Sequence, residues 1–206
     1  MSTPVSLTAI ILAAGRSRRM GAQNKLLLEV GGRPVLARVL AAFANAPVAE
    51  IIVVTGADHD RVAALVEGQE PVRRAYNPDF ESGMASSIRR GVQAARKDVA
   101  GFVICPGDLP FLSGDVVRRL CDVFAEQDSP RIVRPTYEER PGHPVIFDAS
   151  FRGALVSIRG DQGARDVVRR NEAVLTRVPV EDEGVCQDVD TPEALRRARQ
   201  QARNGE

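Results

Sequence analysis

The chain has little net charge, few cysteines and no long hydrophobic run. Its 206 residues include 28 lysines and arginines against 27 aspartates and glutamates, which leaves a net charge of +1. Proteins that bind nucleic acid or a membrane surface usually carry a basic excess, so we expect neither partner. The cysteines are odd in number and far apart, which excludes a disulfide framework or a zinc site and predicts reduced structural thiols; they are Cys105, Cys121 and Cys186.

The apolar segments are too short to cross a membrane. The first of them, residues 7–14, falls well below the ~20 residues that a membrane helix needs. No basic region precedes it, so we expect no signal peptide or anchor and a cytoplasmic protein. With 44% hydrophobic residues and no change of composition along the chain, we expect a single domain over residues 1–206 with an ordered core at about 7–199.

Short β-branched runs alternate with segments of helical periodicity. This alternation predicts an α/β fold, a Rossmann-like three-layer α/β/α sandwich around a mostly parallel sheet. In such a sheet, ligands bind beyond the carboxyl ends of the strands. The expected strands are 7–12, 50–55, 101–105, 131–133, 144–147 and 173–179; the expected helices are 34–43, 60–67, 113–126 and one that opens at 191–193, before a frayed tail from 200 to 206.

Basic side chains crowd the loop after the first strand. Residues 9–21 read AIILAAGRSRRMG, and Lys25 follows closely. Four cations within ten residues repel one another, which favours a polyanionic ligand. Gly15 and Gly21 allow tight turns that present backbone N–H groups beside these cations. The pattern fits a triphosphate; the alternative is a solvated loop whose arginines only keep the surface soluble.

Two aspartates stand in loops that can meet at one edge of the sheet. Asp108 follows the strand 101–105 in the sequence PGDLP, and Asp190 precedes the last helix in DVDTPE. A simple turn is the alternative role for Asp108, and helix capping is the alternative for Asp190, although Thr191 can already serve as the cap. Mg²⁺ is commonly held by one or two carboxylates, water and substrate phosphates. Asp108 and Asp190 could supply that pair.

These motifs resemble the signature of the MobA-like nucleotidyltransferases: LAAGxSxRMG followed by a lysine, then GDxP, then DxDTPE. The resemblance implies a fold of the nucleotide-diphospho-sugar transferase type and an NTP transferase activity. It implies that Arg19 and Lys25 contact phosphate oxygens, that Asp108 and Asp190 bind Mg²⁺, and that Asp188 is a supporting acid. Lys25, Arg19 and Asp108 are then the catalytic residues. The nucleotide-binding backbone is that of Leu12, Ala13, Ala14 and Gly15.

Later segments resemble the molybdenum cofactor cytidylyltransferase branch, often called MocA. They are NPDFESGMASS at 77–87, RPGHPVIF at 140–147 and GDQGAR at 160–165. The first leads into a helix whose N-terminal N–H groups could bind phosphate or a polar ring edge, although capping and turning are the alternatives for each residue alone. The resulting candidates are Ser82 and Gly83 for the nucleotide and Ser86, His143, Asp161 and Arg165 for the acceptor. A structural His143 and a surface pair of Arg165 with Asp161 are the alternatives.

The resemblance implies transfer of a nucleoside monophosphate from an NTP to the phosphate of a molybdopterin-type acceptor, with release of pyrophosphate. CTP is favoured over GTP, because Ala14 stands where the guanylyltransferase branch has the first glycine of LAGG, and its methyl group leaves less room for a purine. A molybdenum hydroxylase is the client that the branch suggests. The alternatives are a guanylyltransferase of the same pathway, another small-molecule cytidylyltransferase such as that of isoprenoid synthesis, and a non-catalytic carrier of the finished cofactor.

Overall fold

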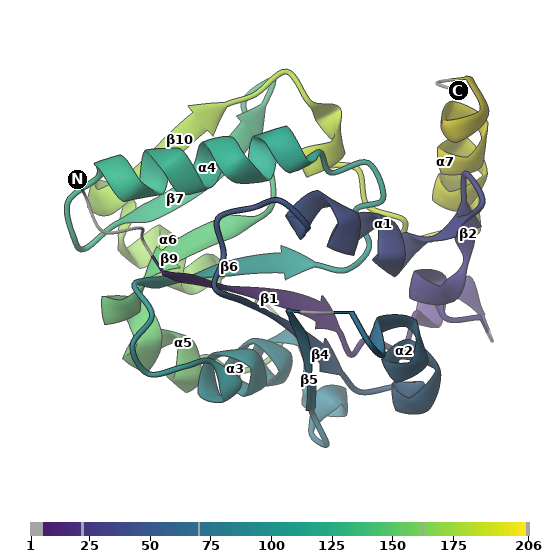
Figure 1. The fold of residues 1–206 in the computed structure, drawn as a ribbon, viewed down its shortest axis with the longest axis horizontal. Coiled ribbons are helices and arrows are strands. Elements are labelled where there is room, and N and C mark those ends of the chain that lie inside the picture. Colours follow the sequence, from purple (N-terminus) through teal and green to yellow (C-terminus); the bar gives the residue numbers. More distant parts are fainter. Residues whose placement is uncertain (1–5, 22, 70, 162, 205–206) are drawn as a thin grey trace.

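The computed structural model describes residues 6–21, 23–69, 71–161 and 163–204. One large sheet lies between two layers of helices (Figure 1). Its strands follow the order β10-β7-β9-β6-β1-β4-β5, and β8 pairs with β7. Their bounds are β1 Leu7–Ala13, β4 Glu50–Thr55, β5 Val72–Tyr76, β6 Gly101–Pro106, β7 Ile132–Tyr137, β8 Arg140–Pro141, β9 Val145–Asp148 and β10 Leu175–Pro179.

Strand β1 lies inside the sheet, where it is paired in parallel with β4 on one side and β6 on the other. All pairs from β6 to β5 are parallel, whereas β9 runs antiparallel to both β6 and β7. Leu12 aligns with Val54 and with Pro106, so the carboxyl ends of these three strands are level. The loops that follow β1 and β6 therefore leave the sheet at the same edge, where ligands bind in open α/β sheets.

Alternating residues of β1 face two separate hydrophobic clusters. Ile11 packs on the side of α1 (Val35–Phe43), α2 (His59–Val66) and α4 (Gly114–Glu126). Ile10 packs on the side of α3 (Met84–Ala94), α5 (Arg152–Ser157) and α6 (Arg165–Arg170). This two-sided burial explains why the strand reads as a nearly continuous apolar run.

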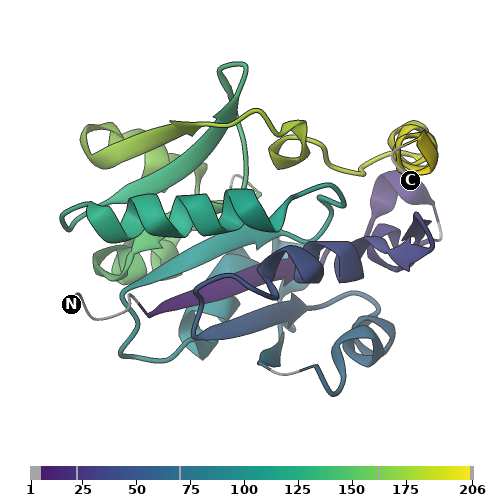
Figure 2. The same ribbon diagram turned by 45° about the horizontal axis from the view of Figure 1, so that its top comes forward.

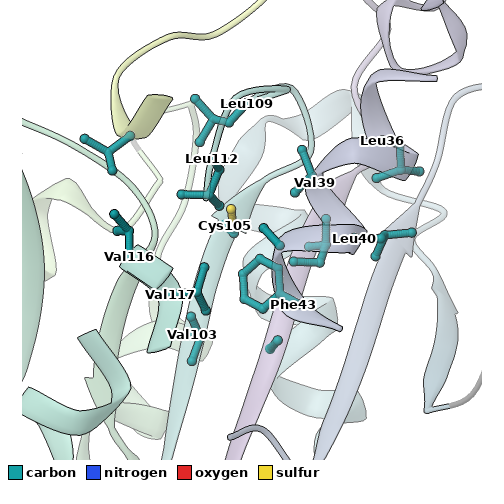
Figure 3. Close-up of a cluster of buried hydrophobic side chains, with 14 of the residues drawn as sticks. Leu36, Val39, Leu40, Phe43, Val103, Cys105, Leu109, Leu112, Val116 and Val117 are labelled. Carbon is teal, nitrogen blue, oxygen red and sulfur yellow. The ribbon is translucent and has the colours of Figure 1, made fainter. Parts of the chain in front are cut away.

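The first cluster joins α1, α4 and the middle of the sheet (Figure 3). Phe43 of α1 and Val117 of α4 are fully buried against Val103 and Cys105 of β6. Burial raises the pKa of the Cys105 thiol well above its usual range. This thiol is therefore protonated at neutral pH and has a packing role.

The last helix, α7 (Pro192–Asn204), crosses to the N-terminal part of the chain. Figure 2 shows it nearly end on, beside the hairpin formed by β2 (Glu29–Val30) and β3 (Arg33–Pro34). Arg199 Nε of α7 donates a hydrogen bond of 2.9 Å to the carbonyl of Glu29. This contact brings the segment just before α7 to the loop that follows β1.

The α/β sandwich predicted from the sequence is confirmed. Ser113 Oγ accepts from Val116 N at 3.3 Å and Thr191 Oγ1 accepts from Ala194 N at 3.2 Å, so both expected helix caps are present. The sequence predicted a frayed tail from residue 200. This prediction is wrong up to Asn204, because α7 continues to that residue. Residues 205–206 lie outside the described residues. No helix in the described ranges is long and apolar enough to cross a membrane.

Candidate active site

A cleft of ≈ 440 Å³ opens where β1 and β6 end. Its walls come from the loop after β1, the turn before α3, the loop after β6 and the segment before α7. Cationic and acidic side chains both line it: Arg16, Arg18, Arg19 and Lys25 on one hand, and Glu81, Asp108, Asp161 and Asp190 on the other. Sequence motifs that are far apart in the chain therefore meet in one cavity.

The loop after β1 is held in shape by its own hydrogen bonds. Ser17 adopts the left-handed conformation, with φ 49°, and its Oγ accepts from Lys25 N at 3.1 Å. Asn24 Oδ1 accepts from Leu26 N at 3.0 Å, and Leu26 is buried. At Gly15, a Cβ would meet nothing within 4 Å, so the space in front of the backbone is open to a ligand. Lys25 is thus fixed at its backbone while the cleft beside Gly15 stays accessible.

Lys25 lies between two of the predicted metal ligands. Its Nζ donates hydrogen bonds to Asp108 Oδ2 and to Asp190 Oδ1, and Arg19 Nη1 donates to Asp190 Oδ2 at 2.8 Å. Burial favours the neutral form of Lys25, but the two carboxylates outweigh it and raise the pKa of the ammonium. Burial also opposes ionisation of Asp190, yet Lys25 and Arg19 together lower the pKa of that carboxyl. The lysine is therefore cationic, and Asp190 ionised, at neutral pH.

Asp188 joins Asp108 and Asp190 in a three-carboxylate cluster. One oxygen from each of the three lies within 4.8 Å of the others. The carbonyl of Asp108 accepts from Val189 N at 3.0 Å, which fastens the segment before α7 to the loop after β6. Asp188 is exposed, but partial loss of hydration, and then the neighbouring Asp108 and Asp190, raise the pKa of its carboxyl. The sequence motif identified Asp188 as a supporting acid, and the fold places its carboxylate beside the other two.

The residues present fit a divalent cation. Asp108 Oδ1 is buried and has no hydrogen-bond partner among the described residues, which is costly for a carboxylate oxygen unless a ligand completes its shell. Hard carboxylate oxygens are the donors that Mg²⁺ prefers. The cluster of Asp108, Asp188 and Asp190 is thus suited to such an ion by donor chemistry and by its unsatisfied oxygen.

A second cavity of ≈ 130 Å³ adjoins the cleft. Leu12, Met84, Pro106 and Asp161 line both, so the two spaces share a wall. His143 and Arg165, which the sequence suggested for the acceptor, both line the second cavity. Its remaining lining is largely apolar: Ile88, Ile104, Val145, Phe147, Gly163, Ala164, Val168 and one further polar residue, Arg134.

Arg134 was not found by sequence reasoning. It lies on β7 between apolar neighbours, and a single arginine in such a strand is typical of a solvent-exposed position. No sequence motif includes it. Only the pairing of β7 with β9 and the folding back of the 140–147 segment bring it beside His143.

Two serines of the 77–87 segment lie away from both cavities. Ser82 Oγ donates to the carbonyl of Asp79 at 2.8 Å and does not line the cleft, although Gly83 does. Ser86 is 2% exposed, and its hydroxyl donates to Gly83 O and accepts from Asn77 Nδ2, each at 2.8 Å. Ser86 therefore lines neither cavity, whereas the neighbouring Ser87 lines the cleft, and an acceptor contact from Ser86 stays a prediction.

Backbone N–H groups at the start of α3 already donate hydrogen bonds within the protein. Ala85 N donates to Gly160 O at 3.0 Å and Ser86 N donates to Gly83 O at 3.1 Å. These bonds use N–H groups that the sequence analysis had offered to a ligand. Arg165 makes no ion pair with Asp161 within the described part of the chain, so the surface pair considered as the alternative is absent there.

Comparisons with known proteins find relatives of this chain in both sequence and fold. The sequence model of the MobA-like NTP transferase domain matches residues 9–174. Nicotine blue oxidoreductase of Paenarthrobacter nicotinovorans is 32% identical, over 93% of this chain and 95% of its own length. The crystal structure of an Rv0371c homologue from Mycobacterium sp. strain JC1 has 27% identity and a TM-score of 0.85, covering 97% of this chain and 98% of that one. The crystal structure of Rv0371c of Mycobacterium tuberculosis H37Rv in complex with manganese has 26% identity and a TM-score of 0.78. The match covers 96% of this chain and 100% of that one.

Proposed function

This chain belongs to the MobA-like NTP transferase family, and from that premise we propose that it transfers CMP from CTP to the phosphate of a molybdopterin-type acceptor, releasing pyrophosphate. The observation that carries the proposal is the meeting of Arg19, Lys25, Asp108 and Asp190 in one cleft at the carboxyl ends of β1 and β6. The second cavity, which shares a wall with this cleft, supplies a place for the acceptor.

The nucleotide is assigned to the loop after β1. Its base and ribose approach the backbone of residues 12–15, where Gly15 leaves open space. Its triphosphate is neutralised by Lys25 and Arg19, whose charge-assisted contacts are the strong kind. Arg16 donates to Glu81 at 2.6 Å, which joins the loop to the turn before α3 and narrows one side of the cleft.

Catalysis by this site needs no protein nucleophile. A phosphate monoester is already anionic near neutral pH, so an oxygen of the acceptor phosphate forms a bond to the α-phosphorus while the bond from that phosphorus to the bridging oxygen breaks. Pyrophosphate leaves with the electron pair. The task of the protein is then to align the two phosphates and neutralise charge.

Asp108 and Asp190, with Asp188 beside them, are the residues that would hold Mg²⁺. When bound, the ion would supply charge neutralisation between donor and acceptor phosphates. Manganese in the related Rv0371c structure supports a divalent ion at such a fold. Lys25 remains cationic in this environment and takes part of the triphosphate charge.

The proposed preference for CTP rests on Ala14. This residue lines the cleft, its carbonyl accepts from Ala57 N at 3.2 Å, and its methyl group lies against Gly56. A methyl group at this position narrows the space for a base. Transfer of GMP from GTP is the alternative activity. It stays an alternative because one methyl group discriminates between two bases by only ~1–3 kcal/mol.

The test is a pyrophosphate-release assay with the full chain, Mg²⁺, molybdopterin and each of the four NTPs, followed by mass analysis of the product. A cytosine dinucleotide is the expected product. A guanine dinucleotide would replace the substrate assignment and keep the reaction class. No pyrophosphate from any NTP, together with tight binding of the finished dinucleotide, would instead identify a carrier. In the proposed role the product passes to a molybdenum hydroxylase.

A further inference from the structure

Two walls of the cleft come together at Gly56, which follows β4. These walls are the loop after β1 and the turn Phe80–Ser82, which lies before α3. A Cβ at Gly56 would lie 2.6 Å from Phe80 Cβ and 2.8 Å from Ala14 Cβ, so this glycine sits directly between the two walls. Ala14 and Gly56 are buried, and Phe80 is half-buried. The two walls are therefore closely packed at this point.

One ion pair joins the same two walls where they are exposed to solvent. Arg16 Nη1 donates to Glu81 Oε1 at 2.6 Å, and both side chains line the cleft. They are 46% and 62% exposed. No other side-chain hydrogen bond links residues 14–21 to residues 79–83, all of which the structure describes. The pair is therefore the polar connection between these two walls.

Arg16 points away from the contacts that its neighbouring cations make. Arg19 and Lys25 are bonded to the carboxylate cluster, whereas Arg16 is bonded to the opposite wall. Its partner Glu81 adds a negative charge to a cleft that is proposed to bind a triphosphate, and this charge repels such a ligand. The favourable contribution of Glu81 to the site therefore lies in its contact with Arg16.

We propose that Glu81 is a positioning residue, which acts through Arg16 to hold the loop after β1 against the turn before α3. The ion pair is intact in the closed cleft, with or without nucleotide, and is broken only while the cleft is open. Its loss therefore speeds nucleotide entry and exit alike, and leaves the affinity nearly unchanged. The effect is small, because exposed ion pairs contribute little free energy. This inference deepens the proposed function and rests on it for the ligand, a nucleotide that binds in this cleft.

The first measurement is hydrogen exchange of the backbone amides of the two walls in the free full chain. The double variant Arg16→Met with Glu81→Gln removes the ion pair and keeps the net charge. We expect it to raise the exchange rates of these amides by about two- to fivefold, and the swapped variant Arg16→Glu with Glu81→Arg to restore protection. The matched control is Arg177→Met with Glu172→Gln. That pair also has a 2.6 Å separation, is 55% and 52% exposed, and does not line the cleft.

The second measurement is stopped-flow binding of the fluorescent N-methylanthraniloyl-CTP to the same variants in the presence of Mg²⁺. We expect the double variant to raise the association and dissociation rate constants together, by about two- to fivefold, and the swapped variant to return both toward the wild type. A change in the association rate constant alone would indicate electrostatic steering and overturn the proposal. Wild-type amide exchange in the folded double variant would overturn it as well.

The two measurements separate this inference from the proposed function. Faster amide exchange in the double variant, with no binding of the CTP analogue by the wild type, would count against CTP as the substrate, and the rate constants are then measured with the corresponding GTP analogue. No binding of either analogue would overturn both proposals. Normal pyrophosphate release with unchanged amide exchange would count against this inference alone. Circular dichroism checks the fold, and Glu81→Gln alone replaces the double variant if that variant does not fold.

Discussion

Lys25 and Asp108 form an ion pair between the loop after β1 and the loop after β6, and each side chain is only 14% exposed. The same ammonium also contacts Asp190. A cation from the protein therefore stands among the carboxylates that fit a divalent ion. In the absence of metal, Lys25 limits the repulsion among these acidic groups.

Because Lys25 competes with a metal for Asp108 and Asp190, Lys25→Met should bind metal more tightly. We expect affinity for Mn²⁺ in the absence of nucleotide to rise by roughly three- to tenfold, since a nearby positive charge is removed. Electron paramagnetic resonance titration of free Mn²⁺ measures this, with the exposed Lys97→Met as control. Weaker Mn²⁺ binding by Lys25→Met would show that the lysine does not oppose the metal.

Removal of either assigned metal ligand should stop turnover without unfolding the protein. Asp108→Ala and Asp190→Ala each take a carboxylate from a loop, and the loss of transition-state stabilisation should reach ~3 kcal/mol, a hundredfold or more in rate. Steady-state pyrophosphate release gives the rate, and circular dichroism checks the fold. The control is Asp115→Ala on the exposed face of α4. Near-normal turnover by either active-site variant with Mg²⁺ would refute the assignment.

Arg19 should matter more for the triphosphate than its neighbour Arg18. Arg19 is already directed at the cluster through Asp190, whereas Arg18 has no such contact among the described residues. Charge-assisted contacts contribute ~1.5–3 kcal/mol, and because the Arg19 side chain is 73% exposed we expect the lower end of that range. Isothermal titration of CTP into Arg19→Ala and Arg18→Ala makes the comparison. A larger loss for Arg18→Ala would contradict the alignment of the motif.

Ala14→Gly should shift nucleotide preference toward GTP. Ala14 lines the cleft, so removal of its methyl group should leave more room for a base, and the ratio of kcat/KM for CTP to that for GTP should fall, within the ~1–3 kcal/mol that one methyl group can supply. Competition between equimolar CTP and GTP, with products separated by mass, measures the ratio. An unchanged ratio would mean that base selection lies elsewhere in the cleft.

His143 should make the protein less stable toward acid. Its pKa is lowered from 6.5 to about 4 in the folded chain. Between these values the unfolded chain binds a proton that the folded chain does not, so the free energy of unfolding falls as the pH decreases through that window. In His143→Gln this contribution is absent, and the loss of stability between about pH 7 and about pH 5 should be smaller than in the wild type. Urea unfolding at the two pH values tests this; an equal loss in both proteins would exclude the effect.

Local patterns of the sequence were sufficient to predict the architecture and to select residues that the fold brings into one cleft. The apolar run 7–12 and the capped helix 113–126 carry their own periodicity and end signals, so they appear nearly as predicted. Lys25, Asp108 and Asp190 stand in motifs at strand ends or helix starts, and parallel strands bring such positions to one edge. Strand β5 escaped prediction because its central arginines, at 73 and 74, are tolerated only where an edge strand is exposed.

Tertiary structure decided what these residues face. Consecutive residues of a helix point about 100° apart, so the docking of α3 on the sheet determines that Ser87 lines the cleft and Ser86 does not, although both hydroxyls accept from Asn77 Nδ2. Asp188 joins the carboxylate cluster because the backbone of Val189 is bonded to that of Asp108, far away in the chain. Arg134 shares a cavity with His143 because β7 pairs with β9 and because its Nε donates to the carbonyl of Gly142. Side-chain direction depends on packing and hydrogen bonds between distant segments, which a residue pattern within one segment does not contain.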